Sequence, residues 1–447
     1  MKRKNVILFV LSLLPVAAQA QTMLSLEQVR QLAMQHNIEL RTADNHIRMA
    51  QEQQREAFTA YFPQLSSSGI AFKSNGDMLK AKVNTSDVLP SSLAQSLPQD
   101  LLSQVPSQMK MGFLDRGLLF GVTAMQPLFM GGRIVNGNKL AKVGVEAAQL
   151  QRRQSENDVR LNAERYFWQV VRLKENLKTL HAIDSLLSRM EDDVNAAVEA
   201  GVALPNDLLQ VQLRRNEVES NKVNAENGLA LSKMMLAQYI GMDGQPIDVS
   251  ASVSRDRVPE FPLSLKADHD LAVKTTPEYG MLQKNVEAKT LQRRLEIGKR
   301  LPSVAVGASL QHTDLFHAKN DFAAVFATVR IPISDWWGGS HAIKRSKLAE
   351  QNAREELEDQ SQLLRIRMQK NWNDVSDAYR QLTIAHKSIS QSEENLRLHT
   401  DYYNAGTASI SDLLEAEQLY QQSCDHYIES YSLLQTKITE YRNSIGQ

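Results

Sequence analysis

The chain has 447 residues, of which 42% are hydrophobic and 23% charged, and its formal net charge at pH 7 is zero. This composition is typical of folded protein and too apolar for a disordered chain, and the absence of a basic excess argues against binding to nucleic acid. The only cysteine, Cys424, excludes an internal disulfide and a zinc site made of cysteines.

The first twenty residues have the pattern of a secretory signal peptide. Basic residues at positions 2–4 precede an apolar run over 6–18, and Ala18-Gln19-Ala20 is a typical cleavage site. The apolar run is shorter than a helix needs to span a bilayer. We therefore expect residues 1–20 to be a cleaved signal peptide and Gln21 to begin an exported, mature chain.

The rest of the chain follows one plan twice. The segment AGVALPNDLL at 200–209 recurs as AGTASISDLL at 405–414, an offset of 205 residues, whereas Pro63 recurs as Pro302 at an offset of 239 residues. The first copy therefore holds 34 extra residues, which lie before Pro127. We predict three parts after the signal peptide: a first repeat over 21–241, an equatorial linker over 242–265 and a second repeat over 266–447.

Each copy begins with a polar, helix-like stretch, over 24–60 or 266–300, and then reaches a proline. Alternation of apolar and small or polar residues after the proline predicts two strands in each copy. The expected strands lie near 64–73, 118–128, 303–311 and 322–331. A Ser/Pro/Gln-rich loop over 74–117 separates the first pair and accounts for the extra residues.

A glycine pair and a very long helix follow the strands in each copy. Apolar residues recur every seven positions, for example at Leu180, Leu187 and Val194, which favours helices that pack along a narrow seam. At about 1.5 Å per residue, 133–200 would span roughly 100 Å and 205–241 roughly 50 Å. Two short helices stacked end to end would therefore match one long helix.

No catalytic constellation is evident in the sequence. GRIVNGNK at 132–139 nearly spells a phosphate-binding loop, but its lysine is one position late and the following Ser or Thr is missing. A tight junction between strand and helix explains these glycines better. We therefore expect no enzyme, no cofactor and no bound metal.

The two glycine turns are the best candidates for function. Glycine allows a left-handed link between antiparallel helices, Pro205 suits the first turn of a helix, and Ser409 with Asp412 predicts a capping box. In the simplest interpretation, Asp207 and Asp412 only cap the helices that follow the turns.

The whole plan resembles the TolC-like outer-membrane efflux factors. The resemblance rests on motifs that occur in the same order in both copies: FPQLSSSG with LPSVAVGA, QPLFMGGR with IPISDWWGG, and the paired turns. It implies a mainly α fold with a small β part, in which a duplicated unit supplies long coiled-coil-like helices to a trimeric α-barrel. A shared 12-stranded transmembrane β-barrel, with four strands per chain, would continue this α-barrel beyond a mixed equatorial region.

A shared barrel also follows from the open edges of a four-stranded sheet. Hydrocarbon does not tolerate unpaired backbone groups, so other copies of the chain would have to complete the sheet. The resemblance accordingly implies a homotrimer in contact with outer-membrane lipid. It would be located in the outer membrane with a long periplasmic extension.

The resemblance also assigns roles to residues near the turns. Asp412 and Glu415 would form acidic rings at the periplasmic mouth, and Tyr403 and Asp207 would belong to the links that close it. The arginine that the family pattern places two residues after the second glycine is Ala408 in this chain. The helical hairpin of a periplasmic adaptor (membrane fusion) protein would dock on the exposed tips, formed by Gly201, Val202, Ala203, Gly406, Thr407 and Ala408.

We therefore predict an outer-membrane exit channel of a tripartite efflux or type I secretion system. It would be a passive duct, opened at its periplasmic tip by the adaptor and by an inner-membrane pump of the RND or ABC type. The alternative is a periplasmic coiled-coil protein without a pore, with a structural or adaptor role. A binding or hydrolytic enzyme forms a third class that no residue cluster supports.

Overall fold

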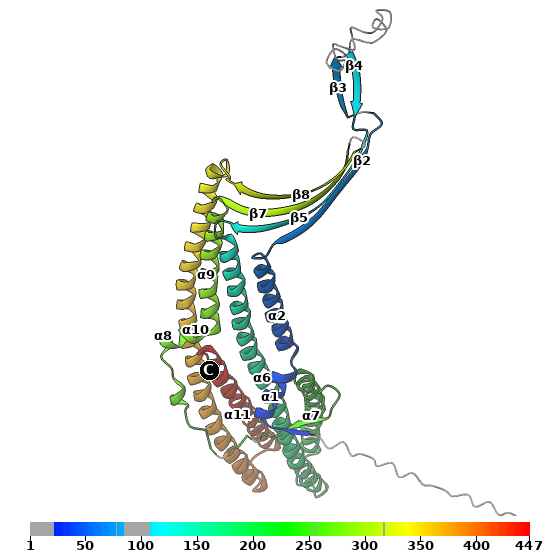
Figure 1. The fold of residues 1–447 in the computed structure, drawn as a ribbon. Helices are drawn as coiled ribbons and strands as arrows, with labels where there is room; N and C mark the ends of the chain where they lie inside the picture. The colour runs from blue at the N-terminus through cyan, green and yellow to red at the C-terminus, as the bar shows by residue number, and fades with distance from the viewer. Residues whose placement is uncertain (1–21, 77, 85–107, 252, 256, 316–317) are drawn as a thin grey trace, which may run out of the picture. The chain divides into compact units, whose positions relative to one another are not determined.

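The computed structural model describes residues 22–447 except 77, 85–107, 252, 256 and 316–317 (Figure 1). The predicted signal peptide lies outside the described residues. The chain divides into two compact units, which we call the helical unit and the sheet unit. The helical unit contains the described residues up to Arg48 together with Glu146–Lys284 and Glu355–Gln447, and the sheet unit contains Met49–Val145 and Asn285–Arg354.

The same order of main elements occurs twice, as expected for a duplicated unit: a helical stretch, two strands of the main sheet, a very long helix, a turn and a shorter helix. The first copy contains β1 (Thr22–Leu24), α1 (Leu26–His36), α2 (Ile38–Thr59), β2 (Gln64–Lys73), β3 (Leu79–Asn84), β4 (Gln108–Phe113), β5 (Arg116–Phe129), α6 (Arg133–Glu199) and α7 (Pro205–Tyr239). The linker and second copy contain β6 (Ile247–Val249), α8 (His269–Ala272), α9 (Pro277–Gly298), β7 (Ser303–Leu315), β8 (Ala318–Arg330), α10 (Asp335–Asn404) and α11 (Ile410–Ser444). No helix in the described ranges has the length and apolar character that a membrane span requires.

Four antiparallel strands make up the main sheet of the sheet unit, in the order β2-β5-β7-β8 (Figure 1). The strands cover most of the predicted ranges and extend beyond them at the end of β7 and the start of β8, where pairing continues to Leu315 opposite Ala318. The sequence pattern predicted strands only up to 311 and again from 322, because polar residues predominate between these positions. Ladder hydrogen bonds join backbone groups and do not depend on apolar side chains, so the strands run further than the hydrophobic pattern.

The predicted loop over 74–117 is wrong at both of its ends. β3 and β4 form an antiparallel pair from Leu79 opposite Phe113 to Asn84 opposite Gln108. In β3 apolar residues alternate with lysine or asparagine, a strand pattern that the Ser/Pro/Gln-rich composition of the whole segment obscured. The centre of this segment, 85–107, lies outside the described residues.

A close backbone contact joins the two copies inside the sheet unit. Gly131, just after β5, has a φ of +63°, and a Cβ atom there would lie 2.3 Å from the carbonyl oxygen of Gly298 at the end of α9. A Cβ atom at Gly298 would lie 2.4 Å from the carbonyl oxygen of Gly131. Only glycine at both positions allows the strand-to-helix junction to approach α9 this closely.

An ion-pair group also connects α9 with α10 in this unit. Glu350 on α10 accepts hydrogen bonds from Arg293 on α9 at 2.6 Å and from Arg354, one turn further along α10, at 2.8 Å. The bonds from Arg354 and Arg293 lower the pKa of Glu350 to about 2. The carboxylate therefore stays ionised far into the acid range.

In the helical unit, the stretch predicted as one helix over 24–60 is two helices. Asn37 is 5% exposed and has an extended backbone conformation, which ends α1. Its side-chain oxygen accepts a hydrogen bond from the backbone N–H of Glu39 at 2.8 Å, so the same residue starts α2. Its amide group donates to the carbonyl oxygen of Tyr239 at 3.4 Å and ties this break to the end of α7.

The predicted helix over 266–300 begins later than expected. Residues 263–275 form short helical turns, and the continuous helix α9 starts at Pro277. Proline lacks a backbone N–H and fits only the first turn of a helix. The preceding residue, Thr276, accepts the backbone N–H of Tyr279 at 3.3 Å and supports this start.

The long helices of this unit pack along the predicted heptad seam. Six residues of this seam are almost completely buried: Leu180, Leu187, Val194, Met368, Val375 and Leu382. In the linker, Arg255 donates to the hydroxyl of Thr179 on α6 at 2.8 Å and to the sulfur of Cys424 on α11 at 3.4 Å. The linker therefore joins α6 to α11 by side-chain contacts as well as joining the two copies covalently.

Candidate functional site

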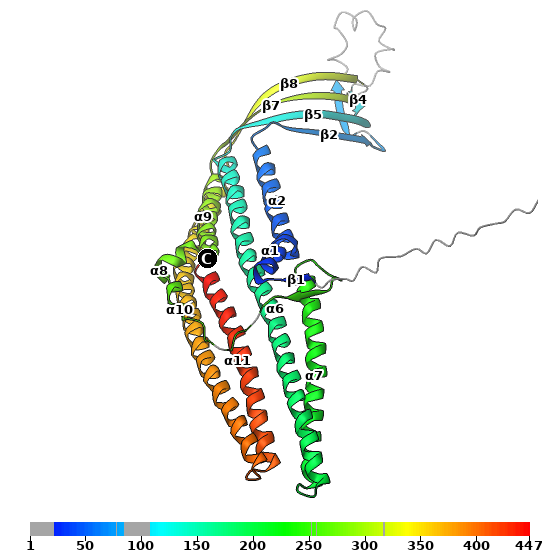
Figure 2. The ribbon, with the colours of Figure 1, turned by 90° about the horizontal axis from the view of Figure 1, so that it is seen from below.

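The two predicted glycine turns have the same backbone structure and lie at the same end of the helical unit (Figure 2). Gly201 has a φ of +74° and Gly406 a φ of +71°. The N–H of Val202 donates to the carbonyl of Ala197 at 2.9 Å, and that of Thr407 donates to the carbonyl of Tyr402 at 2.9 Å. These equivalent bonds satisfy carbonyl groups at the ends of α6 and α10.

The helix after the second turn begins with the predicted capping box. The hydroxyl of Ser409 accepts the N–H of Asp412 at 3.2 Å, and the carboxylate of Asp412 accepts the N–H of Ser409 at 3.0 Å and its hydroxyl at 2.7 Å. The hydroxyl and N–H of Ser409 hold the pKa of Asp412 below its usual value. In this structure the carboxylate of Asp412 therefore serves as a cap.

The helix after the first turn has half of this arrangement. Pro205 occupies the first turn of α7, and the carboxylate of Asp207 accepts the N–H of Leu204 at 3.1 Å. Leu204 stands where the other turn has Ser409 and has no side-chain acceptor. The capping interpretation thus holds for both aspartates, with a weaker cap in the first copy.

The other predicted gate residues differ in their surroundings. Tyr403 is half-buried at the end of α10, and burial followed by the charges of Asp207 and Asp193 raises the pKa of its hydroxyl. The Tyr403 hydroxyl forms no hydrogen bond within the described part of the chain. Glu415 is exposed, one turn after Asp412 on α11.

The predicted docking residues are mostly exposed. Val202 is 80% exposed, and its neighbour Leu204 is 67% exposed. Ala203 and Ala408 are half-buried, whereas Gly201, Gly406 and Thr407 are exposed. A Cβ atom on either glycine would meet nothing within 4 Å. The tip surface therefore combines exposed apolar side chains with open space over both turns.

The two hairpins pack against each other directly beside the turns. Val194 and Val211 of the first hairpin and Ile410 and Leu413 of the second share one buried apolar cluster. At its edge, the hydroxyl of Ser411 donates to the side-chain oxygen of Gln210 at 2.8 Å. A change in the distance between the hairpins would expose this cluster.

A buried ion pair lies next to this cluster, and sequence reasoning missed it. Arg214 on α7 donates from Nε to one oxygen of Glu417 on α11 at 2.8 Å and from Nη2 to the other at 3.3 Å. Further bonds from Arg214 reach Glu217 at 2.7 Å and Gln421 at 2.7 Å. The side chain of Arg214 is 9% exposed and that of Glu417 is 0% exposed.

The burial of this pair opposes its charges. Burial raises the pKa of Glu417, and the hydrogen bonds and charge of Arg214 act against that rise. Glu417 occupies a heptad position that is otherwise apolar, between Ile410 and Cys424, and Arg214 is buried between the apolar seam residues Val211 and Val218. Charged residues in a heptad seam were the signal that could have identified them.

Among the described side chains, no group of three or more His, Cys, Asp or Glu residues could hold a metal ion. What the tips offer instead is backbone geometry, exposed apolar surface, carboxylates and one buried ion pair between hairpins. These features suit a contact that can form or separate.

One family model matches most of the chain. A family model described as "Outer membrane efflux protein" matches residues 29–242 and 270–446. No curated protein sequence matches the chain.

Solved structures resemble the chain over nearly its whole length. CusC, described as forming a transmembrane channel, is 14% identical with a TM-score of 0.76, and the match covers 97% of this chain and 95% of CusC. The outer membrane channel CmeC of Campylobacter jejuni is 15% identical with a TM-score of 0.73, covering 94% and 85% of the two chains. The outer membrane protein VceC of Vibrio cholerae is 15% identical with a TM-score of 0.71, covering 94% and 96%.

Proposed function

Because the chain belongs to the outer membrane efflux protein family, it is an outer-membrane exit duct of efflux systems, and we propose that a homotrimer of it opens at the helix tips. The main support for opening at the tips is the pair of equivalent glycine turns, with exposed apolar residues, at one end of the helical unit. This family consists of channel proteins rather than enzymes. The alternative of a coiled-coil protein without a pore is therefore set aside.

The main sheet supports the trimer. Its outer strands, β2 and β8, each pair on one side only among the described strands. In a membrane such edges must be satisfied, and sheets from three chains would close into one 12-stranded barrel. The helices of the three chains would then form the α-barrel that continues the duct through the periplasm.

The tips support an adaptor as partner. A helical hairpin that ends in a similar turn can approach Gly201 and Gly406 closely, because nothing covers these glycines in the described chain. The exposed side chains of Val202 and Leu204 would give the contact its apolar area. The adaptor would in turn connect the duct to an inner-membrane pump of the RND or ABC type, for drug efflux or type I secretion.

In the proposed gate, Asp412 and Glu415 of three chains form acidic layers at the mouth. Three carboxylates around one axis concentrate negative potential and favour cations. Tyr403 and Asp207 form part of the closing links. The buried pair Arg214–Glu417 supports the same closed arrangement from between the hairpins, in a chain that has Ala408 where the family pattern has arginine.

The docking proposal is tested by replacing both tip glycines with leucine. A left-handed backbone costs a residue with a side chain about 1–2 kcal/mol, and the new side chains would occupy the docking space. We expect the double variant Gly201→Leu with Gly406→Leu to form a trimer, as measured by native mass spectrometry. We expect it not to restore export when it is expressed in a strain that lacks the wild-type gene, as measured by drug susceptibility.

The matched control is Gly244→Leu in the linker. Gly244 has a φ of +76° and open space around its Cβ position, so this variant carries the same backbone strain away from the tips. We expect normal export from it. Normal export by the double tip variant would contradict docking at the turns.

A further inference from the structure

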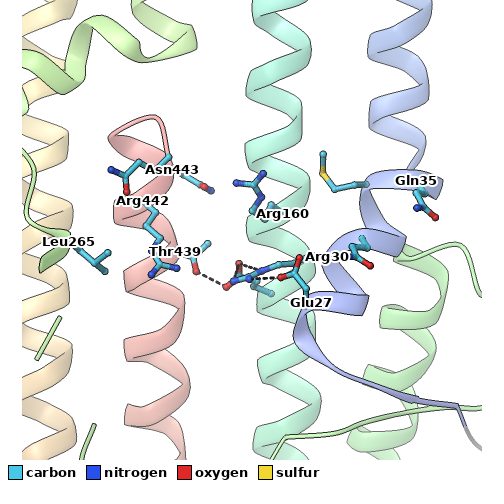
Figure 3. Close-up of a pocket in the computed structure, with 12 residues that line it drawn as sticks. Glu27, Arg30, Gln35, Arg160, Leu265, Thr439, Arg442 and Asn443 are labelled. Carbon is cyan, nitrogen blue, oxygen red and sulfur yellow. Dashed lines mark hydrogen bonds and ion pairs between the residues drawn. The ribbon is translucent and has the colours of Figure 1, made fainter. Parts of the chain in front are cut away.

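We propose that the helical unit binds a small organic anion, with a phosphate or carboxylate group and neighbouring hydroxyl groups, in a cavity between α1, α6 and α11 (Figure 3). The cavity has a volume of about 580 Å³. Pockets of this size hold small organic ligands. The proposal concerns a site separate from the tips and does not depend on how the duct opens.

Three arginines from three helices line the cavity: Arg30 on α1, Arg160 on α6 and Arg442 on α11. Two glutamates, Glu27 and Glu164, also line it. The formal charge of these five side chains is +1. The charge is therefore suited to an anion, provided that the glutamates are already engaged.

Arg30 engages both glutamates. Its guanidinium lies 2.7 Å from one oxygen of Glu164 and 3.1 Å from Glu27. The other oxygen of Glu164 accepts the hydroxyl of Thr439 on α11 at 2.5 Å, and the Glu164 side chain is only 2% exposed. These bonds hold the three helices together and occupy both oxygens of Glu164.

Arg160 and Arg442 have no such partners. Throughout the described residues, neither guanidinium takes part in a hydrogen bond or an ion pair. In Figure 3 the side chain of Arg160 extends from α6 towards α11, and that of Arg442 lies over α11 beside Thr439. Guanidinium groups bind phosphate and carboxylate through paired N–H donors in a fixed geometry. Two such groups at one cavity provide the donors that an oxyanion requires.

The remaining lining is polar and indicates more than a bare oxyanion. Asn443 donates to the carbonyl of Asn157 at 3.0 Å, whereas its own side-chain oxygen is buried without a hydrogen-bond partner. Asn443 is one of the residues that line the cavity, and amide groups there can form hydrogen bonds with hydroxyl groups of a ligand. Gln31 and Gln35 add further amide groups. A sugar phosphate or a sugar acid combines the required anionic and hydroxyl groups.

Isothermal titration calorimetry on the full-length protein in a non-ionic detergent tests the proposal. The probes are glucose 1-phosphate and glucuronate, with inorganic phosphate and glucose for comparison. We expect both sugar anions to bind and glucose not to bind. Arg160→Gln or Arg442→Gln removes a charged hydrogen bond and should weaken binding about ten- to hundredfold.

Arg153→Gln is the matched control. Arg153 is an exposed arginine on α6, two helical turns before Arg160, and it does not line the cavity. It removes the same charge and should leave the affinity within about twofold, since screening weakens charges at that distance. Circular dichroism and native mass spectrometry check that each variant folds and assembles like the wild type.

Arg160→Lys tests whether binding needs the paired N–H donors of arginine or only its positive charge. We expect weakened binding from it, because lysine keeps the charge and loses the planar fork. The proposal is overturned if neither sugar anion binds at 10 mM, a concentration of the order of the weakest ligand affinities, or if all arginine variants bind alike. Inorganic phosphate bound as tightly as glucose 1-phosphate would overturn the assignment to an organic anion. None of these results bears on export, so the two proposals fail separately.

Discussion

The buried pair Arg214–Glu417 leads to a sharp prediction about the gate. Glu417→Leu removes the carboxylate and leaves the guanidinium of Arg214 between α7 and α11, where it is 9% exposed. Glu217 and Gln421 still accept hydrogen bonds from it. Among the described residues, the ion-pair partner that Arg214 then keeps is Glu217, three residues further along α7, whose side chain is 56% exposed and which therefore compensates poorly.

Breaking a buried pair by removing one partner costs about 3–5 kcal/mol. If the hairpins separate when the mouth opens, Arg214 regains water in the open state, and the cost falls on the closed state alone. A penalty of this size raises the ratio of open to closed forms roughly 10²- to 10⁴-fold for each subunit. We therefore expect Glu417→Leu to increase the fraction of time that single channels conduct in planar bilayers.

The double variant Arg214→Leu with Glu417→Leu is the decisive comparison. Both side chains are buried beside apolar residues of the seam, and replacing a buried pair by apolar residues is often neutral or stabilising. We expect the double variant to close as well as the wild type or better. The reasoning is refuted if Glu417→Leu leaves the conducting fraction unchanged, or if the double variant conducts as much as the single one.

Three further predictions concern pH, cation block and the junction of the two copies. Because its pKa is lowered to about 2, Glu350 stabilises the fold above about pH 4.5 and loses this effect as the pH falls through 2. Glu350→Gln should lower the free energy of unfolding by about 1–2 kcal/mol at pH 7 after solvent screening. In thermal unfolding, the difference in stability between the wild type and this variant should become smaller in acid. A difference that does not change with pH would count against the ion pair. Asp412→Asn with Glu415→Gln should relieve block of the conductance by multivalent cations from the tip side, and unchanged block would remove both residues from the mouth. Gly131→Ala should lower the melting temperature because its Cβ would meet a carbonyl oxygen of α9 at 2.3 Å, whereas Gly132→Ala, also left-handed but without that clash, should cost less.

Local signals account for most of what the sequence predicted about the fold. Glycine and proline mark the ends of elements, and seven-residue spacing marks the seam at Leu180 and Leu187, because these signals act within one or two turns of chain. The break at Asn37 escaped prediction because the polar pattern continues across it. Its cause includes a contact with Tyr239, 202 residues away.

In the candidate site, too, the local features could be predicted from the sequence and the contacts between distant residues could not. The capping box of Ser409 and Asp412 was readable because both partners lie within one helical turn. Arg214 and Glu417 are 203 residues apart and meet only because α7 packs on α11. The cavity arginines come from three helices, so no local pattern contains them. Proposed roles for Tyr403 and Glu415 depend on the family resemblance and stay predictions.

The equivalence of the two turns bears on how many partner molecules the tips of a trimer can bind. In a trimer the six turns would present nearly sixfold backbone geometry, since Gly201 and Gly406 make equivalent hydrogen bonds. Their side chains alternate, with Leu204 in one turn and Ser409 in the other. A partner that contacts only the backbone could bind in six copies, and a partner that recognises side chains in three. The stoichiometry of the assembled pump would therefore report which chemistry the partner uses.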